Sequence, residues 1–166
     1  MGNITRALVL SLFIAGCATG YSESGFRGGY EETQLSPDVF RVSFKGNAYT
    51  SMDRAADFTL LRSAELALEN GFPYFIIVDE KQWTKNETYT TPTQTTTTAN
   101  VYGYGNTASG TAYSTTTGGQ TYNYAKPRAT NTIVLLRDKD GVNGLVFDAQ
   151  YLVESLQNKY NIQPKE

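Results

Sequence analysis

The sequence predicts an α+β domain of two layers, and three observations support this fold class. Residues 52–70 carry a helical apolar stripe, and the apolar runs at 39–44 and 72–78 flank it as strands do. A third apolar run at 132–136 is followed by a second helical pattern at 149–160. The predicted order is therefore β-α-β-(hairpin)-β-α, with a long segment rich in Thr and Tyr in the place of the hairpin.

The first strand and helix have clear local signals. Residues 39–44 alternate as a half-buried strand does, with three apolar residues on one face. Thr50 or Ser51 caps the helix that follows, and Gly71 ends it. If the strands on either side of this helix are neighbours, we expect the crossover to be right-handed. The apolar stripe consists of Ala56, Leu60, Leu61, Ala64, Ala67 and Leu68, and the polar residues Arg54, Arg62, Glu65 and Glu69 are placed opposite or beside it.

The remaining regular elements follow the same logic. Residues 72–78 are almost continuously apolar, which is typical of a central strand buried on both faces. Residues 132–136 form another buried strand, and Asp148 caps the helix predicted at 149–160. The side chains expected to face inward on this helix are Leu152, Val153, Leu156 and Tyr160.

The segment from residue 88 to 125 contains no charged residue in 38 positions. It includes fourteen Thr, six Tyr and five Gly, and Val101 is its only branched aliphatic residue. Two structures fit this composition. The segment can be disordered, because it has almost no aliphatic surface to bury. It can also be an extended β-hairpin, because Thr and Tyr favour strands.

A symmetry argument favours the hairpin. With its tip near residues 106–110, Tyr102 falls roughly opposite Tyr113. Further out, the apolar strand that ends near Val78 falls opposite residues 131–137, so these two strands would be antiparallel neighbours. Pro92 lacks an amide hydrogen and would have to lie at an edge or a bulge.

The first 16 residues have the pattern of a secretory signal peptide. Arg6 precedes residues 7–15, which are apolar except for Ser11. A spanning helix needs about 20 apolar residues, so this run is too short to remain across a bilayer. The only cysteine of the chain, Cys17, comes directly afterwards.

The tripeptide Ile14, Ala15 and Gly16 followed by Cys17 resembles the lipobox of bacterial lipoproteins. The resemblance implies signal-peptidase cleavage before the cysteine and acylation of its thiol and new amine. Because Ala18 rather than aspartate follows, it also implies the outer membrane, with the domain facing the periplasm. An ordinary cleaved signal with an incidental cysteine, or a buried N-terminal strand, are the alternatives.

The chain is accordingly divided into four parts. Residues 1–16 are the signal peptide, and residues 17–37 are the lipidated cysteine and a tether with no sustained periodicity. Residues 38–160 form the single α+β domain, and residues 161–166 are a C-terminal tail. Twenty flexible residues reach about 25 Å, so we expect the domain to stay near its membrane.

Composition excludes several classes of function. The net charge is −2 and no run of Lys or Arg is present, so we expect no basic patch and no nucleic-acid partner. The absence of His, with the lone Cys as an anchor, leaves the usual triads and zinc sites without their parts. We therefore expect no metal, no cofactor and no enzymatic activity. A hydrolase that uses a lone carboxylate is the alternative, with Asp53, Asp57 or Glu65 as candidates.

Five tyrosines of the uncharged segment form the candidate binding surface, because tyrosine offers a rigid amphipathic ring at low entropic cost. They are Tyr102, Tyr104, Tyr113, Tyr122 and Tyr124. A glycan or an envelope protein is the expected partner, and an exposed hairpin edge also allows self-association. The alternative is that these rings pair across the strands or lie idle in a loop.

Four stretches carry a further resemblance. They are FRGGYEETQL at 26–35, FRVSFKGNAY at 40–49, LLRSAEL at 60–66 and GFPYF at 71–75. In these stretches the chain resembles an uncharacterised family of proteobacterial envelope lipoproteins. The resemblance implies a lipoprotein and carries no catalytic residue to transfer. We expect a lipid-anchored, non-enzymatic envelope module for binding or assembly. The alternatives are an envelope hydrolase that uses a lone carboxylate and an accessory subunit of an outer-membrane complex.

Overall fold

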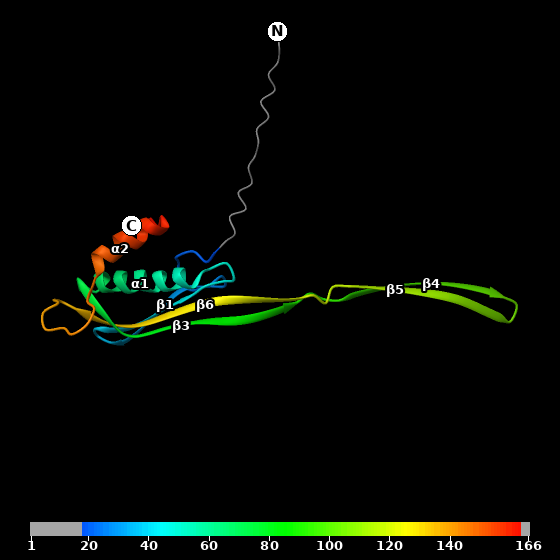
Figure 1. The fold of residues 1–166 in the computed structure, drawn as a ribbon, viewed down its shortest axis with the longest axis horizontal. Coiled ribbons are helices and arrows are strands. Elements are labelled where there is room, and N and C mark those ends of the chain that lie inside the picture. The colour runs from blue at the N-terminus through cyan, green and yellow to red at the C-terminus, as the bar shows by residue number, and fades with distance from the viewer. Residues whose placement is uncertain (1–17, 164–166) are drawn as a thin grey trace, which may run out of the picture.

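A computed structural model describes residues 18–163, and the predicted α+β class is confirmed. The predicted signal peptide with its recognition residues Ile14, Ala15 and Gly16, the predicted acylation site Cys17 and the end of the tail at 164–166 lie outside the described residues. Figure 1 shows a body in which both helices lie on one side of a sheet, and a long hairpin that extends away from this body.

The body is built on an antiparallel sheet with the strand order β1-β2-β6-β3-β7. Its strands are β1 (Gly29–Ser36), β2 (Val39–Lys45), β6 (Thr121–Leu136), β3 (Tyr74–Thr90) and the short β7 (Phe147–Asp148). β6 pairs with β2 on one side and with β3 on the other. The strands before and after the first helix are therefore parallel but separated by one strand, and they are not neighbours.

Local capping signals set the two helices. α1 (Met52–Glu69) begins after Ser51, whose hydroxyl accepts a hydrogen bond from the Arg54 amide at 3.1 Å. α2 (Ala149–Tyr160) begins after Asp148, whose carboxylate accepts from the Tyr151 amide at 3.0 Å. Both helices lie where the sequence predicts them, and α2 packs against α1.

The core lies between α1 and one face of the sheet. Alternate residues of β2 and β6 point toward the helix, so that these strands show the burial pattern of a sheet covered on one face. The small residues Ala64 and Ala67 of α1 are fully buried and let the helix approach the strands closely. The larger core side chains are Phe40, Val42, Phe44, Phe58, Leu61, Phe75, Ile133 and Leu135.

The N-terminal segment is part of the body, so the predicted tether over residues 17–37 is wrong in its described part. Thr19 is only 3% exposed, and its amide donates to the Thr50 hydroxyl at 3.1 Å. The Tyr21 ring packs against Tyr30 and Phe58, with ring centroids 4.9 and 5.3 Å away. Single aromatic side chains hold this segment against the body. They do not recur at a regular spacing in the sequence, so the search for periodicity does not detect them.

This segment also buries a flank of α1 that the sequence places in solvent. Arg62 is 6% exposed because Tyr30 and Glu32 of β1 cover it. Its guanidinium lies 5.0 Å from the Tyr30 ring centroid and makes ion pairs with Glu32, Glu65 and Glu69 at 2.9, 3.3 and 2.7 Å. The polar side of the predicted helix is therefore a charge cluster that is buried at Arg62, nearly buried at Glu65 and half-exposed at Glu69.

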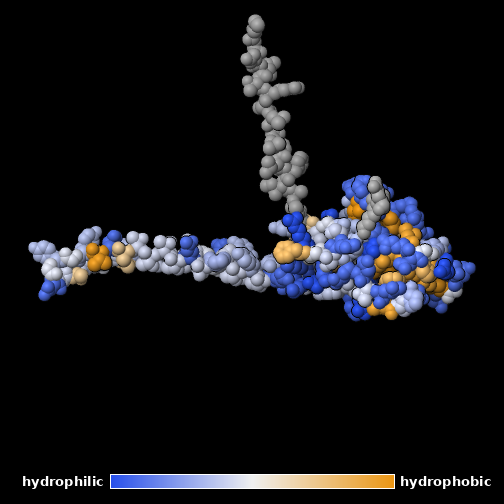
Figure 2. All heavy atoms as spheres, turned by 180° about the vertical axis from the view of Figure 1, so that it is seen from behind, coloured by the Kyte–Doolittle hydropathy of each residue, from blue (hydrophilic) through white to orange (hydrophobic). Residues whose placement is uncertain are grey.

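Residues 88–125 form the hairpin alternative of the two that the composition allows. β4 (Gln94–Tyr104) pairs antiparallel with β5 (Thr107–Thr117), and the pairing of β3 with β6 continues this hairpin back into the body. We call residues 88–123 the arm. Figure 2 shows that the arm is pale along most of its length, because Thr, Tyr, Ser and Gly lie near the middle of the hydropathy scale.

The register of the arm differs from the expected one. The turn lies at Gly105 and Asn106, so that Tyr102 pairs with Ser109 and Tyr113 pairs with Thr98. Gly105 has φ +60°, the left-handed conformation that suits the first position of a two-residue hairpin turn. The symmetry of the sequence around residues 106–110 does not reveal which glycine makes the turn. The tip is therefore predicted a few residues too far along the chain.

Candidate functional site: the hairpin arm

The outer part of the arm, residues 94–117, is called the distal arm, and the part between it and the body is the proximal arm. One face of the distal arm carries tyrosines. Tyr102, Tyr104 and Tyr113 share this face because directly paired residues and residues two apart lie on the same side of a ribbon. They are 75%, 94% and 69% exposed, and none of the ring contacts among the described residues involves them. The expected pairing of Tyr102 with Tyr113 is wrong, and these rings are free to contact another molecule.

The opposite face of the distal arm is almost flat. Its cross-strand pairs are Thr95 with Thr116, Thr97 with Ser114, Ala99 with Ala112, Val101 with Gly110, and Gly103 with Ala108. The first two pairs are joined by hydroxyl hydrogen bonds of 2.9 and 3.1 Å. The arm therefore presents a smooth face and a tyrosine face, and neither is covered by the body (Figure 1).

The two remaining predicted tyrosines lie apart from this face. Tyr122 pairs with Tyr89 on the proximal arm, and its hydroxyl donates to the Gln120 side chain at 2.6 Å. Tyr124 pairs with Glu87 at the base of the arm, with the Lys126 ammonium 5.3 Å from its ring centroid. The structure thus brings three of the five predicted tyrosines together and separates the other two.

A break divides the proximal from the distal arm. Pro92 lies there, outside the ladder as expected, opposite Gly118 and Gly119. Gly118 has φ +93°, and a β-carbon at that position would collide with the carbonyl oxygen of Pro92. The strands stay connected across the break, since the Gly119 amide donates to the Thr91 carbonyl oxygen at 3.0 Å.

The arm has no hydrophobic cover of its own. Every residue of β4 and β5 is exposed, and an isolated two-stranded ribbon in water is at best marginally stable. Both outer edges of this ribbon also carry unpaired backbone donors and acceptors. A long ribbon with these properties gains stability when another molecule covers its edges or its tyrosine face.

Two of the three candidate catalytic carboxylates, Asp57 and Glu65, are held by neighbouring side chains. The Asp57 carboxylate accepts hydrogen bonds from the Lys159 ammonium and the Tyr160 hydroxyl, both at 2.6 Å. The Glu65 carboxylate accepts from the Tyr21 hydroxyl and from Arg62. Asp53 lies exposed in the first turn of α1, where a carboxylate favours the helix dipole.

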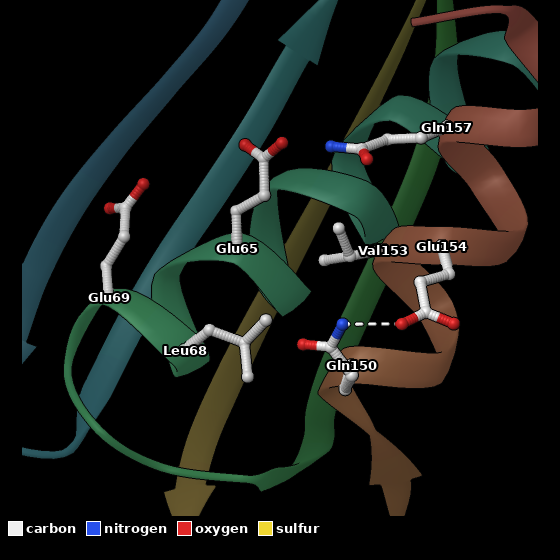
Figure 3. A pocket seen from close by; sticks show the side chains of 7 residues that line it. All are labelled: Glu65, Leu68, Glu69, Gln150, Val153, Glu154 and Gln157. Carbon is white, nitrogen blue, oxygen red and sulfur yellow. Dashed lines mark hydrogen bonds between the residues drawn. The ribbon is translucent and has the colours of Figure 1, made fainter. Parts of the chain in front are cut away.

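A groove of about 390 Å³ between α1 and α2 contains three carboxylates, as Figure 3 shows. It is lined by Glu65, Leu68, Glu69, Gln150, Val153, Glu154 and Gln157. Glu65 and Glu69 pair with Arg62, and Glu154 accepts a hydrogen bond from Gln150 at 2.6 Å. These carboxylates are engaged in structural contacts, so the groove presents no free acid and base pair.

Residues 18–163 contain neither a metal-binding cluster nor a membrane-spanning helix. No group of three or more His, Cys, Asp or Glu side chains there is arranged to hold a metal ion. No helix in the same range is long and apolar enough to cross a membrane. Comparison of the chain with protein-family models, curated proteins and solved structures gave no match.

Proposed function

We propose that this protein is a lipid-anchored, non-enzymatic module of the cell envelope whose hairpin arm docks onto an envelope partner. The observation that carries the proposal is the set of three exposed tyrosines on a ribbon that nothing in the body covers. The two-layer body, in the observed order β-β-α-β-(arm)-β-β-α, has one strand more at its start and one more before α2 than the sequence predicts, and it serves as the rigid base from which the arm projects. Acyl chains on Cys17 hold this base at the outer membrane, facing the periplasm.

The anchor and the body are closer together than the sequence suggests. Thr19 is buried, its hydroxyl donates to the Arg27 carbonyl oxygen at 2.9 Å, and the same hydroxyl accepts from the Asn47 amide at 2.9 Å. Only Ala18 then separates an acylated Cys17 from the fixed part of the fold. We infer that the body rests directly on the bilayer, and that its reach comes from the arm.

The arm is long enough to act at a distance. β4 alone has 11 residues and spans about 37 Å at the usual rise of a strand. The absence of charge along the arm removes the desolvation cost that a charged ribbon would have on binding. Exposed tyrosines give large contact areas with few rotatable bonds, which suits them to be the anchors of an interface. A protein partner, either a second copy or another envelope protein, fits these features.

We propose no catalytic role for the carboxylates. Asp57 and Glu65 each accept hydrogen bonds from a cation and from a tyrosine hydroxyl, and these contacts give both carboxylates a structural role. The lack of histidine points in the same direction.

The anchor is tested by Cys17→Ser. We expect this variant to lose labelling by radioactive palmitate in cells and to leave the membrane fraction. Ser11→Cys, which places a thiol within the apolar run, is a control that should not restore labelling. Unchanged labelling and fractionation of Cys17→Ser would contradict the lipid anchor.

The arm is tested by a replacement that closes the hairpin early. Thr90 and Thr121 are a cross-strand pair with hydroxyls 3.1 Å apart, so residues 91–120 can be replaced by an Asn-Gly turn. Because the removed residues make no contact with the core, the free energy of unfolding should change by less than about 0.5 kcal/mol. Partner binding should be lost. A shortened protein that still co-purifies with the partner would refute the role of the arm.

A further inference from the structure

The face of the sheet opposite the helices carries a row of functional side chains. Trp83 of β3 pairs with Arg128 of β6, and Arg128 pairs with Lys45 of β2. The neighbours of Lys45 and Arg128 in sequence are buried on the helix side, and Trp83 pairs directly with Arg128, so these three side chains lie together on the face that neither helix covers. Trp83 is the only tryptophan of the chain and is 44% exposed.

Like charges are placed directly opposite each other on this face. Arg128 pairs with Lys45, and in the next row Lys126 pairs with Lys85. Such cross-strand pairs are destabilising, because the β-carbons of paired residues are only about 5 Å apart. The whole chain has a net charge of −2, so this arrangement is a local excess that the composition does not show. The expectation of no basic patch is wrong here, because these cations come from three strands that are far apart in sequence.

Carboxylates neutralise only part of this charge. Glu31 accepts from Lys45 at 2.6 Å, and Glu87 accepts from Lys126 and Lys85 at 2.6 and 3.0 Å. The hydrogen bonds from the two lysines lower the pKa of Glu87 to about 2, so its carboxylate is charged at every physiological pH. Arg27 and Arg128 are without a carboxylate partner among residues 18–163. The surplus positive charge is therefore held on two arginines.

Two adjacent recesses share Lys45 and Arg128. The first, of about 70 Å³, is lined by Trp83 together with the hydroxyls of Ser43 and Thr130. The second, of about 180 Å³, is lined by Arg27, by Lys126 and by Phe26, whose side chain is fully exposed. An aromatic ring therefore stands at each end of the site, and cations lie between them. Both recesses are smaller than the pockets that bind drug-sized molecules.

We propose that this face binds a saccharide that carries one anionic group, a phosphate or a carboxylate. The sugar ring stacks on Trp83, because an indole face matches the apolar face of a pyranose. The anionic group accepts hydrogen bonds from the Arg128 guanidinium and the Lys45 ammonium, the arrangement in which charge-assisted bonds are strongest. Ser43, Thr130 and Glu31 are placed to bond the sugar hydroxyls.

The two carboxylates at the site favour this ligand over a nucleic acid. Glu31 and Glu87 would repel the regularly spaced phosphates of a polyanion, whereas they accept hydrogen bonds from hydroxyl groups. Trp83 and Phe26 also stand at opposite ends of the site, and two separated rings do not form the continuous series of platforms that successive bases need. The site rests on the sheet face and on the loop at residues 25–28, and it stands whether or not Cys17 is acylated or the arm has a partner.

The fluorescence of Trp83 reports this site directly, since the full chain contains no other tryptophan. The full chain in a non-ionic detergent is titrated with glucose 6-phosphate and with glucuronic acid, which carries one carboxylate. Glucose and inorganic phosphate are the matched probes without the charge or without the sugar. We expect one of the two anionic saccharides to give a saturable change at a concentration at least about tenfold lower than any matched probe.

Variants locate the binding on this face. Arg128→Gln keeps the reporter and should weaken binding by about tenfold or more, because a charge-assisted contact is lost. Arg41→Gln removes a cation from the same face outside both recesses, and it should leave binding unchanged. Trp83→Ala removes the fluorescent reporter, so its binding is measured by calorimetry. The variant should bind the anionic saccharide less tightly and should bind inorganic phosphate with unchanged affinity.

Three results would overturn the proposal. The first is that neither anionic saccharide binds more tightly than inorganic phosphate. The second is that Arg128→Gln and Arg41→Gln lower the affinity equally. The third is that a ten-residue oligothymidylate binds more tightly than both saccharides, which would assign the face to nucleic acid.

Discussion

The substitution Arg62→Met tests the buried charge cluster of the body. The methionine retains much of the volume of the arginine stem and removes the guanidinium that joins Glu32, Glu65 and Glu69. Burial pushes the pKa of Arg62 down, but its hydrogen bonds to Glu32 and Glu69 outweigh this and raise the pKa above its ordinary value. The positive charge is therefore a fixed part of the folded state, and its loss leaves three carboxylates together.

The exposure of the three carboxylates sets the expected magnitude. Removal of one partner from a buried ion pair costs about 3–5 kcal/mol, because it leaves a buried charge without compensation. The Glu69 and Glu32 side chains are half and one-third exposed, so water can solvate them after the substitution. Glu65 is almost buried and bears most of the penalty. We therefore expect a loss near the lower limit, about 3 kcal/mol.

Urea denaturation of the purified protein gives the free energy of unfolding. Arg137→Met is the matched control, because Arg137 stacks on the Phe72 ring at 4.7 Å and has no carboxylate partner among the described residues. It should cost no more than about 1 kcal/mol. Glu65→Gln added to Arg62→Met should restore part of the loss. An Arg62→Met cost below about 1 kcal/mol would mean that this flank of α1 is solvated, and the packing of the N-terminal segment described above would be refuted.

Further predictions concern the N-terminal segment and the break in the arm. Burial first, and then its hydrogen bond to Glu65, raise the pKa of Tyr21 well above 10, so its contribution to stability is complete below pH 10 and is lost as the pH rises further. Tyr21→Phe should lower the free energy of unfolding by about 1.5–3 kcal/mol at pH 7. Above pH 10, the free energy of unfolding of the variant should fall with pH less steeply than that of the original protein, by up to about 1.4 kcal/mol per pH unit. Urea denaturation from pH 7 to 11 measures both effects, and equal slopes for the two proteins would contradict the prediction. Gly118 has φ +93° and no room for a side chain. Gly118→Val should therefore raise the rate of amide hydrogen exchange across residues 94–117 and leave the amides of the body protected. An unchanged exchange pattern would show that the break tolerates a side chain.

Sequence reasoning locates elements that have local signals. The apolar stripe and the caps at Ser51 and Asp148 place both helices within about one residue of their observed ends. Alternation and apolar runs likewise locate β2 and the inner halves of β3 and β6, since their burial depends on one covered face.

The same reasoning does not reach features that depend on contacts between distant residues. Residues 18–36 are held in place by Tyr21 and Tyr30, whose contact partners lie on α1. These two tyrosines follow no periodic spacing in the sequence. The register of the arm depends on one turn glycine, because repeated Thr residues fit several registers equally well. The row formed by Lys45, Arg128 and Trp83 cannot be read from spacing in the sequence, because β2, β6 and β3 contribute one residue each and only the sheet order brings them together.

The role of the arm is tested most directly by site-specific photo-crosslinking in living cells. A photoreactive phenylalanine analogue replaces Tyr113 on the arm, and Tyr151 on α2 in the control, because both side chains are 69% exposed. We predict one discrete adduct from position 113, identified by mass spectrometry as a single envelope protein or a second copy of this chain, and no adduct from position 151. The absence of an adduct from position 113, or equal adducts from both positions, would contradict the proposal that the arm is the docking element.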